Sequence, residues 1–360
     1  MLPKLLVPLV KYFSAFNVFR YLTFRSAYAA VTALLCAFLL GPVVIRWLKV
    51  LKFGQSIRED GPESHMQKKG TPTMGGILIL ASVVLSTLLW ADLENIRVWI
   101  VVFAIVGFGL VGFMDDWLKI KLKTSDGLSA RSKLIGQFLV SAIAVSMLYI
   151  FRGPETTLLY LPFIKNAVLE LGVYWIPIAI VYVMAWSNAV NLTDGLDGLA
   201  IGLVILSIIA FSILTYITGR ADWSAYLNIP FIKSAGELTV VTLALMGACV
   251  GFLWFNSHPA EVFMGDVGSL SLGGVLAVLA LIVKKEVLLF IIGGVFVLEE
   301  ASVIIQVLYF KITKGKRVFK MAPLHHHFEL SGWDEAKVVT RFWILGGLFT
   351  IIALSTLKIQ

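Results

Sequence analysis

Paired carboxylates follow a long apolar run in the segment GFMDDWLK, where Asp115 and Asp116 are adjacent. The two negative charges repel each other, and at the C-terminal end of a helix they would also oppose the helix dipole. A divalent cation would relieve both costs, and Mg²⁺ binds carboxylate oxygens together with the phosphates of a substrate. The pair therefore indicates a metal or phosphate site, with a solvent-exposed helix end as the alternative.

A second acidic segment, NAVNLTDGLDG, places Asn191, Asp194 and Asp197 at every third residue. Gly195 and Gly198 are expected to break the helix and form a tight turn, whose carboxylates and free N–H groups suit a nucleotide or a metal. The segment lacks the ligand spacing and the final glutamate of an EF-hand loop. A plain turn between two membrane spans is the alternative, but such a turn would not require carboxylates.

Two further motifs lie later in the chain. FMGDVGS places Asp266 near the expected start of a helix, where a carboxylate and a phosphate are both favoured, although a simple helix cap would also use aspartate. APLHHHFE contains the consecutive histidines His325, His326 and His327, which lack the i, i+4 spacing of a helical zinc site. In a loop they could contact phosphate, transfer protons or help to bind a metal, or they could form an ordinary polar loop.

Other polar residues leave two explanations open. The lysines near the aspartate pair either gather phosphate groups or set the membrane topology: Lys119, Lys121, Lys123 and Lys133. In KKGTPTMGG, Lys68 and Lys69 have the same two explanations, while Pro72 predicts the start of a helix. Glu299 and Glu300 lie inside an apolar run, where they are either functional groups facing the bundle interior or a hydrogen-bonded structural pair.

Composition indicates the elements that must position these side chains. The chain is 59% hydrophobic and 14% charged, whereas soluble domains carry about 25% charged residues, so we expect an all-α polytopic membrane protein. Its net charge of +8 favours anionic headgroups or an anionic substrate over nucleic acid. Short connections and the absence of a repeat predict one integral domain over residues 1–360. Ten spans of roughly 20 apolar residues are expected at 26–47, 73–91, 98–116, 132–150, 172–190, 197–218, 237–255, 267–283, 287–308 and 339–357.

Lysine and arginine predict the orientation of these spans. Most of them fall in the loops after the first, third and ninth spans, so these loops are expected to be cytoplasmic and both termini periplasmic. All five histidines and most of the aspartates then fall on the cytoplasmic side. The sequence therefore predicts that the chemistry takes place at the cytoplasmic face.

Taken together, the motifs KKGTPTMGG, NAVNLTDGLDG, GFLWFN, FMGDVGS and APLHHHFE resemble those of the phospho-N-acetylmuramoyl-pentapeptide transferases. This family belongs to the polyprenyl-phosphate N-acetylhexosamine-1-phosphate transferases, and the similarity runs from about Phe16 to the C-terminus. The resemblance implies transfer of phospho-N-acetylmuramoyl-pentapeptide from UDP-N-acetylmuramoyl-pentapeptide to undecaprenyl phosphate, giving lipid I and UMP. It further implies a Mg²⁺ requirement, a homodimer and a multi-pass location in the bacterial inner membrane, with the lipid bilayer as a partner.

The resemblance also implies roles for individual residues. Asp115, Asp116, His325, His326 and His327 correspond to catalytic positions, and Asp266 to the magnesium-binding aspartate. Positions near the substrate correspond to Lys68, Thr73, Lys119, Lys123, Lys133, Asn188, Asn191, Asp194, Gly195, Leu196, Asp197, Phe263 and Gln306. Glu299 fits the family pattern, whereas Glu300 stands where threonine is expected. Lys119 replaces a third aspartate of wider relatives, which favours the muramoyl-pentapeptide branch over the alternative, a UDP-N-acetylglucosamine transferase.

The residues leave the order of chemical events open. Either the lipid phosphate attacks directly, or an aspartate is phosphorylated first; we favour direct attack, because a lipid phosphate is already anionic. Two functions of other classes are also possible. A secondary transporter would bind its substrate near the bilayer midplane on broken, repeated helices. A lipid-binding scaffold would not require three acidic motifs and three histidines.

Overall fold

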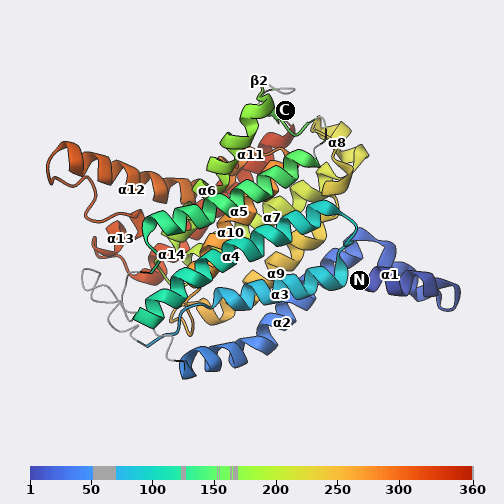
Figure 1. Cartoon of the computed structure of the whole chain (residues 1–360), viewed down its shortest axis with the longest axis horizontal. Helices are drawn as coiled ribbons and strands as arrows, with labels where there is room; N and C mark the ends of the chain where they lie inside the picture. The colour runs from blue at the N-terminus through green and yellow to red at the C-terminus, as the bar shows by residue number, and fades with distance from the viewer. Residues whose placement is uncertain are drawn as a thin grey trace.

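The computed structural model describes residues 1–51, 70–122, 127–151, 153, 155–162, 164 and 169–358. Within these ranges the chain is almost entirely helical (Figure 1). The exception is a short antiparallel ladder between β1 (Leu158–Leu159) and β2 (Leu169–Glu170), in which Leu158 is opposite Glu170. The sequence-based prediction of an all-α polytopic membrane protein is confirmed.

Long helices follow the predicted spans closely. They are α2 (Leu22–Val50), α4 (Ile96–Leu122), α5 (Ala130–Ile150), α6 (Trp175–Thr193), α7 (Leu199–Thr218), α9 (Leu238–Asn256), α10 (Gly265–Val283) and α14 (Glu335–Ser355). Shorter elements are α1 (Leu2–Leu6), η1 (Val7–Lys11), η2 (Ser14–Arg20), η4 (Gly172–Tyr174), α8 (Ala221–Leu227), η5 (Lys233–Ala235), α13 (Leu324–Glu329) and η6 (Thr356–Lys358). These bounds arise because a chain in hydrocarbon must satisfy its backbone groups within each helix.

Two of the ten predicted spans differ from a simple crossing. The second is α3 (Gly76–Trp90), only 15 residues long, which begins four residues after Pro72 and not at it. The ninth consists of α11 (Glu286–Ile292) and α12 (Gly294–Ile312), which meet at a bend of 85°. In the part of the chain that is described, eight helices are long and apolar enough to cross a membrane, or nine with the bent pair. The count of ten crossings and the orientation remain predictions.

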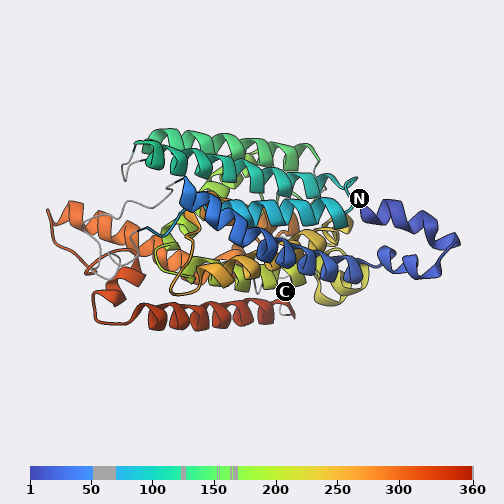
Figure 2. The same cartoon turned by 90° about the horizontal axis from the view of Figure 1, so that it is seen from below.

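Helix α10 forms the centre of the bundle and packs against α3, α4, α6 and α7. Nearly every residue of α10 is buried. Its small residues permit this position because helices in a membrane associate through close packing and not through a hydrophobic force. A side chain at Gly273 would overlap the backbone of α6 at Trp186, and one at Gly274 would overlap Phe108 of α4. Figure 2 shows α5 and α14 on opposite faces of the bundle.

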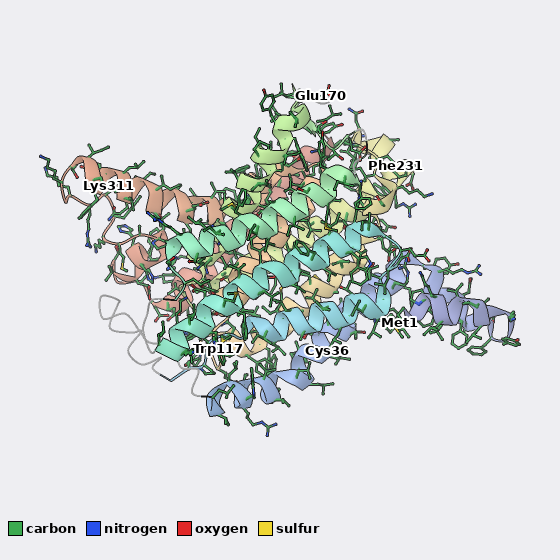
Figure 3. The ribbon with its side chains drawn as sticks, viewed as in Figure 1. Met1, Cys36, Trp117, Glu170, Phe231 and Lys311 are labelled. Carbon is green, nitrogen blue, oxygen red and sulfur yellow. The ribbon has the colours of Figure 1, made fainter. Side chains whose placement is uncertain are left out.

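The bend before α12 directs this helix away from the other helices, so that Lys311 lies at its projecting end (Figure 3). The chain then returns through α13 to α14, and both Figures 1 and 2 show α12 and α13 at one end of the molecule. The three consecutive histidines belong to α13. The expectation that they lie in a loop is therefore wrong, because six residues after Pro323 form a helical turn that packs against α12 and α14.

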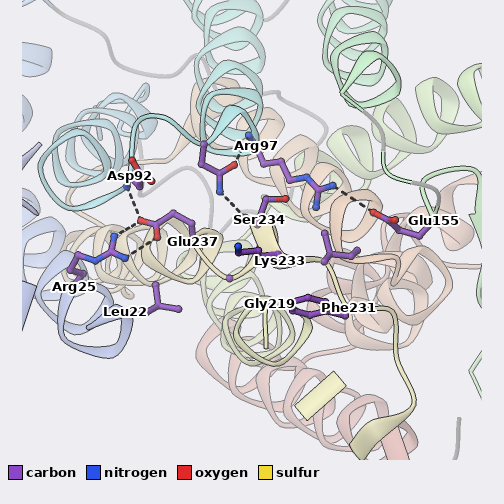
Figure 4. Close-up of a pocket in the computed structure, with 13 residues that line it drawn as sticks. Leu22, Arg25, Asp92, Arg97, Glu155, Gly219, Phe231, Lys233, Ser234 and Glu237 are labelled. Atoms are coloured by element: carbon purple, nitrogen blue, oxygen red, sulfur yellow. Dashed lines mark hydrogen bonds and ion pairs between the residues drawn. The ribbon is translucent and has the colours of Figure 1, made fainter. Parts of the chain in front are cut away.

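The opposite end of the bundle contains a cavity of about 580 Å³, shown in Figure 4. Arg25 of α2 pairs with Glu237 before α9, whose Oε1 also accepts a hydrogen bond from the Asp92 N–H at 2.7 Å. Arg97 of α4 lies 3.6 Å from Glu155. These contacts join the ends of separate helices, and none of the predicted site residues lines this cavity.

Candidate active site

Three carboxylates from two helices meet at the end of the bundle far from the termini. Asp115 and Asp116 lie on α4, and Asp266 lies in the first turn of α10, as predicted. One oxygen of each lies within 4.8 Å of the others, a spacing that suits a single metal ion. The two helices approach this closely because Gly112 has no side chain, and a Cβ there would overlap the Asp266 carbonyl.

The paired aspartates do not end their helix, which corrects the prediction of a span ending at residue 116. Helix α4 continues to Leu122, and Lys119 and Lys121 occupy its last turn, where positive charge is favoured by the helix dipole. Asp115 and Asp116 are consequently buried inside the helix packing and not exposed at its end. The Asp115 carboxylate also accepts a hydrogen bond from the Leu128 N–H at 2.8 Å, which ties the start of the next segment to α4.

Two predicted lysines compensate part of the charge of this acidic group. The Lys119 Nζ lies 2.5 Å from Asp115, 3.5 Å from Asp116 and 3.0 Å from Asp266. The Lys133 Nζ, from α5, lies 2.7 Å from the same Asp266 oxygen. Lys121 is exposed. Of the expected basic patch, Lys119 and Lys133 therefore form ion pairs with the carboxylates. Lys123 lies outside the described residues.

Amide side chains complete the contacts of Asp266. The Asn191 Nδ2 donates to Asp266 Oδ1 at 2.7 Å and to the Ser269 hydroxyl at 2.8 Å, and Asn191 Oδ1 accepts from Lys133 at 3.3 Å. Helices α5, α6 and α10 are thus joined at one point. The sequence interpretation identified Asn191 but missed Ser269, although Ser269 stands one residue after the second glycine of FMGDVGS.

A pair of amide side chains lies about one helical turn further from the carboxylates, along α5 and α6. Gln137 on α5 and Asn188 on α6 exchange hydrogen bonds of 3.2 and 2.9 Å, and Asn188 also donates to the Met184 carbonyl. The prediction of Asn188 near phosphates stays a prediction, and its partner Gln137 is a residue that the sequence interpretation missed. The available signal was a polar residue in the middle of an apolar span, because such residues usually face the bundle interior.

The segments containing Thr73 and Phe263 run side by side next to the acidic group. The Phe263 N–H donates to the Pro72 carbonyl, and the Gly75 N–H donates to the Phe263 carbonyl, each at 2.8 Å. Gly265 has a φ of +71° and lies against both Thr73 and the Asp116 carboxylate. These backbone contacts fix the Phe263 main chain and leave its half-buried ring as the part that can contact a ligand.

The predicted turn after α6 is confirmed by Gly198, whose φ of +79° favours glycine. Asp194 lies at the end of α6 near Asp116 and Asp266, and its burial, assisted by those negative charges, raises the pKa of its carboxyl well above the ordinary value. Asp197 points elsewhere, toward His258 at 3.2 Å, with Glu335 at 3.7 Å from the same histidine nitrogen. The turn therefore separates its two aspartates between two clusters.

Asp197, His258 and Glu335 form the second group close enough to hold a metal ion among the residues described. The sequence interpretation missed His258 and Glu335 as partners because they lie far along the chain from Asp197. Leu196, between the two aspartates, is buried among apolar side chains.

The three histidines have different partners. His325 is buried and its Nδ1 lies 3.1 Å from Glu299, which also accepts the His325 N–H at 3.2 Å. His326 contacts Glu329 at 2.8 Å, and His327 accepts the Lys320 N–H at 3.1 Å. The rings of His325 and His326 lie with their centroids 4.2 Å apart, but the three histidines hydrogen-bond to different partners. The His325 Nε2 instead faces Gly195, where a side chain would overlap the ring.

The remaining predicted residues either contact groups other than the three carboxylates or lie outside the described residues. Of the two glutamates whose role was left open, Glu299 is buried and hydrogen-bonds to His325. Gln306 binds the backbone of Val318 and Phe319 and does not contact the carboxylates in the residues described. Lys68 lies outside the described residues.

Three carboxylates flanked by an amide and a hydroxyl are hard oxygen ligands, which suit a divalent cation such as Mg²⁺, Mn²⁺ or Ca²⁺. Their burial supports this chemistry, because several buried carboxylates require a compensating positive charge. The observed donor set therefore fits a divalent metal without identifying it.

Known proteins match the whole chain. The model of glycosyl transferase family 4 matches residues 98–284, and the first signature of phospho-N-acetylmuramoyl-pentapeptide-transferase matches residues 68–80. Curated relatives carrying the name phospho-N-acetylmuramoyl-pentapeptide-transferase are 51% identical in Thermodesulfovibrio yellowstonii, 54% in Citrifermentans bemidjiense and 52% in Oleidesulfovibrio alaskensis. Each alignment covers 100% of this chain and of the relative. The chain therefore belongs to the phospho-N-acetylmuramoyl-pentapeptide transferases of glycosyl transferase family 4.

Proposed function

We propose that this chain transfers phospho-N-acetylmuramoyl-pentapeptide from UDP-N-acetylmuramoyl-pentapeptide to undecaprenyl phosphate, yielding lipid I and UMP. The observation that carries the proposal is the convergence of Asp115, Asp116 and Asp266 with two lysines at one end of the bundle. Phosphoryl transfer depends mainly on positioning and charge neutralisation, and this group offers both. The relatives' shared name favours the muramoyl-pentapeptide substrate over UDP-N-acetylglucosamine, the alternative sugar donor.

We assign Mg²⁺ as the metal, held by Asp266 with Asp115 and Asp116 beside it. When bound there, it would neutralise negative charge on the diphosphate and on departing UMP. Asn191 holds the Asp266 Oδ1, so this carboxylate keeps a fixed orientation. The choice of Mg²⁺ rests on the family resemblance, and it agrees with the use of carboxylates and substrate phosphates as Mg²⁺ ligands.

Substrate contacts follow from the surroundings of this group. Lys119 and Lys133 would bind phosphate oxygens, with Asn188 held nearby through Gln137. Thr73, Asp194 and the main chain of Phe263 lie near the carboxylates, and these three residues form our candidate nucleoside-binding surface. We retain five further residues as substrate-binding proposals from the family resemblance: Leu196, Asp197, Lys68, Lys123 and Gln306.

The bond changes are those of a direct displacement. A lipid phosphate oxygen attacks the phosphorus attached to the sugar, and the bond from that phosphorus to the bridging diphosphate oxygen breaks, so that both electrons leave with UMP. Asp115 and Asp116 would orient the attacking phosphate, which needs no base because it is already anionic. Among the histidines, His325 is held by Glu299 with its Nδ1 toward the carboxylate, whereas His326 and His327 are more accessible.

The cellular setting completes the proposal. The apolar helices indicate a multi-pass membrane protein, and we propose the bacterial inner membrane as its location from the family resemblance. We therefore propose that the carboxylate end is cytoplasmic, that the protein acts as one integral domain, and that it forms a homodimer in the bilayer.

Radiolabelled UDP-N-acetylmuramoyl-pentapeptide and undecaprenyl phosphate, added to purified enzyme in detergent, test the function directly. We expect UMP and lipid I in equal amounts, with no UMP release before lipid is added to carefully delipidated enzyme. Asp115→Asn should slow turnover severely, whereas Asp222→Asn, at an exposed residue on α8, should not. Absence of lipid-dependent UMP release would refute the transferase function, and a stoichiometric burst without lipid would refute direct attack.

A further inference from the structure

The ammonium of Lys119 lies between the carboxylates that a metal would use. Its Nζ is 2.5, 3.5 and 3.0 Å from single oxygens of Asp115, Asp116 and Asp266, respectively. A divalent ion bound by the three carboxylates would need the oxygens that now face this ammonium. Two cations that share these oxygens would repel each other strongly, so the arrangement with Lys119 bound and the arrangement with metal bound compete.

We propose that Lys119 is an exchangeable internal cation, which compensates the three carboxylates while no metal is present and turns toward substrate phosphate when a divalent ion takes its place. This inference rests on the proposed function, since it assigns these carboxylates to the metal. The exchange gives Lys119 two successive partners. It also predicts that Lys119 stabilises the fold of the metal-free protein, because unpaired buried carboxylates are costly.

The side chain of Lys119 is free to make this exchange. It is 31% exposed, whereas those of Asp115 and Asp116 are 4% exposed, so the ammonium can move outward while the carboxylates stay in place. Lysine has a flexible stem and a point charge, and it needs no fixed hydrogen-bond geometry when it changes partner. Lys133 keeps one positive charge on Asp266 from another helix, α5, and its side chain is less exposed at 20%.

Lys121 provides a matched control on the same helix. It is two residues away, exposed, and makes no ion pair with the three carboxylates. Substituting it changes the net charge of the protein by the same amount as substituting Lys119. Any difference between Lys119→Gln and Lys121→Gln therefore reports the location of the charge and not its loss.

Binding of Mn²⁺ to purified, chelator-treated enzyme without substrates tests the exchange, with free Mn²⁺ measured by electron paramagnetic resonance. We expect Lys119→Gln to bind Mn²⁺ roughly tenfold more tightly than wild type, the effect of removing one charged hydrogen bond that competes with the ion. Lys121→Gln should bind like wild type, and Lys119→Arg, which keeps the positive charge, should not bind more tightly. The metal-free Lys119→Gln protein should unfold at a lower temperature than wild type and gain more from Mn²⁺.

The result that overturns the exchange is equal or weaker Mn²⁺ binding by Lys119→Gln. Binding of Mn²⁺ that Asp266→Asn does not weaken would overturn it as well, because the ion would then lie elsewhere. UMP release by the same wild-type preparation is measured separately. If release is normal while the Mn²⁺ results fail, the exchange is wrong and the transferase function stands; if release is absent, the function itself is wrong.

Discussion

Replacing Gln137 by leucine should disturb the active site, although Gln137 is not one of the residues that contact the three carboxylates. Gln137 is fully buried on α5 and exchanges two hydrogen bonds with Asn188 on α6. Lys133 stands four residues before Gln137, and Asn191 three residues after Asn188, so each pair shares one face of its helix. The amide pair thus fixes the relative position of the two helices that deliver Lys133 and Asn191 to Asp266.

The magnitude follows from the bonds lost. Two amide hydrogen bonds contribute about 1 kcal/mol each in soluble proteins, and about 0.6 on average inside membranes, with a maximum near 1.7. Losing the first of these bonds leaves the buried Asn188 Oδ1 without that donor, which adds the cost of an unsatisfied polar atom. We therefore expect the free energy of unfolding to fall by about 2 kcal/mol. A shift of about 1 Å in the Lys133 ammonium would lower kcat by up to roughly 100-fold.

Thermal unfolding in detergent and the rate of UMP release measure the two effects. Ser141→Ala is the matched control, because Ser141 is fully buried one turn further along α5 and its hydroxyl has no hydrogen-bond partner in the described residues. In the double variant Gln137→Leu with Asn188→Leu, stability should recover, since removing both partners leaves no unsatisfied amide. The reasoning is refuted if Gln137→Leu matches Ser141→Ala in both stability and rate.

Three other predictions concern the metal, the nucleoside and the topology. Asp266→Asn should abolish turnover while the protein still folds, because an amide is an uncharged and weaker metal ligand. A near wild-type kcat of this variant at raised Mg²⁺ would exclude Asp266 as the main ligand. Phe263→Ala should weaken uridine binding by roughly 5- to 150-fold, the equivalent of ~1–3 kcal/mol of stacking. If titration calorimetry gives the same uridine Kd as for wild type, Phe263 has only a packing role. In a variant free of native cysteines, Lys316→Cys should react only with reagent from the cytoplasm and Tyr226→Cys only from outside; the reverse labelling pattern would invert the proposed orientation.

The Asp197 turn illustrates how far sequence patterns reach. Glycine spacing correctly predicted the break in the helix, since Gly198 adopts a positive φ there. The regular spacing of Asn191, Asp194 and Asp197 did not predict that the last two carboxylates belong to different clusters, because their partners come from distant parts of the chain. Glu335, which accepts the Asp197 N–H at 2.9 Å, comes from the start of α14 and is invisible to any local pattern.

The sequence by itself determined the helical elements, because hydrocarbon forces each long apolar run to satisfy its backbone internally. It also placed Asp194 and Asp266 at helix ends, where the apolar runs stop, whereas the pair Asp115 and Asp116 lies inside α4. Only the tertiary structure decided which of these ends meet, since lipid and leucine are equally apolar and hydropathy does not specify which helix packs on which. The approach of α10 to α4 depends on missing side chains at Gly112 and Gly274, and that approach places Asp266 beside Asp115 and Asp116.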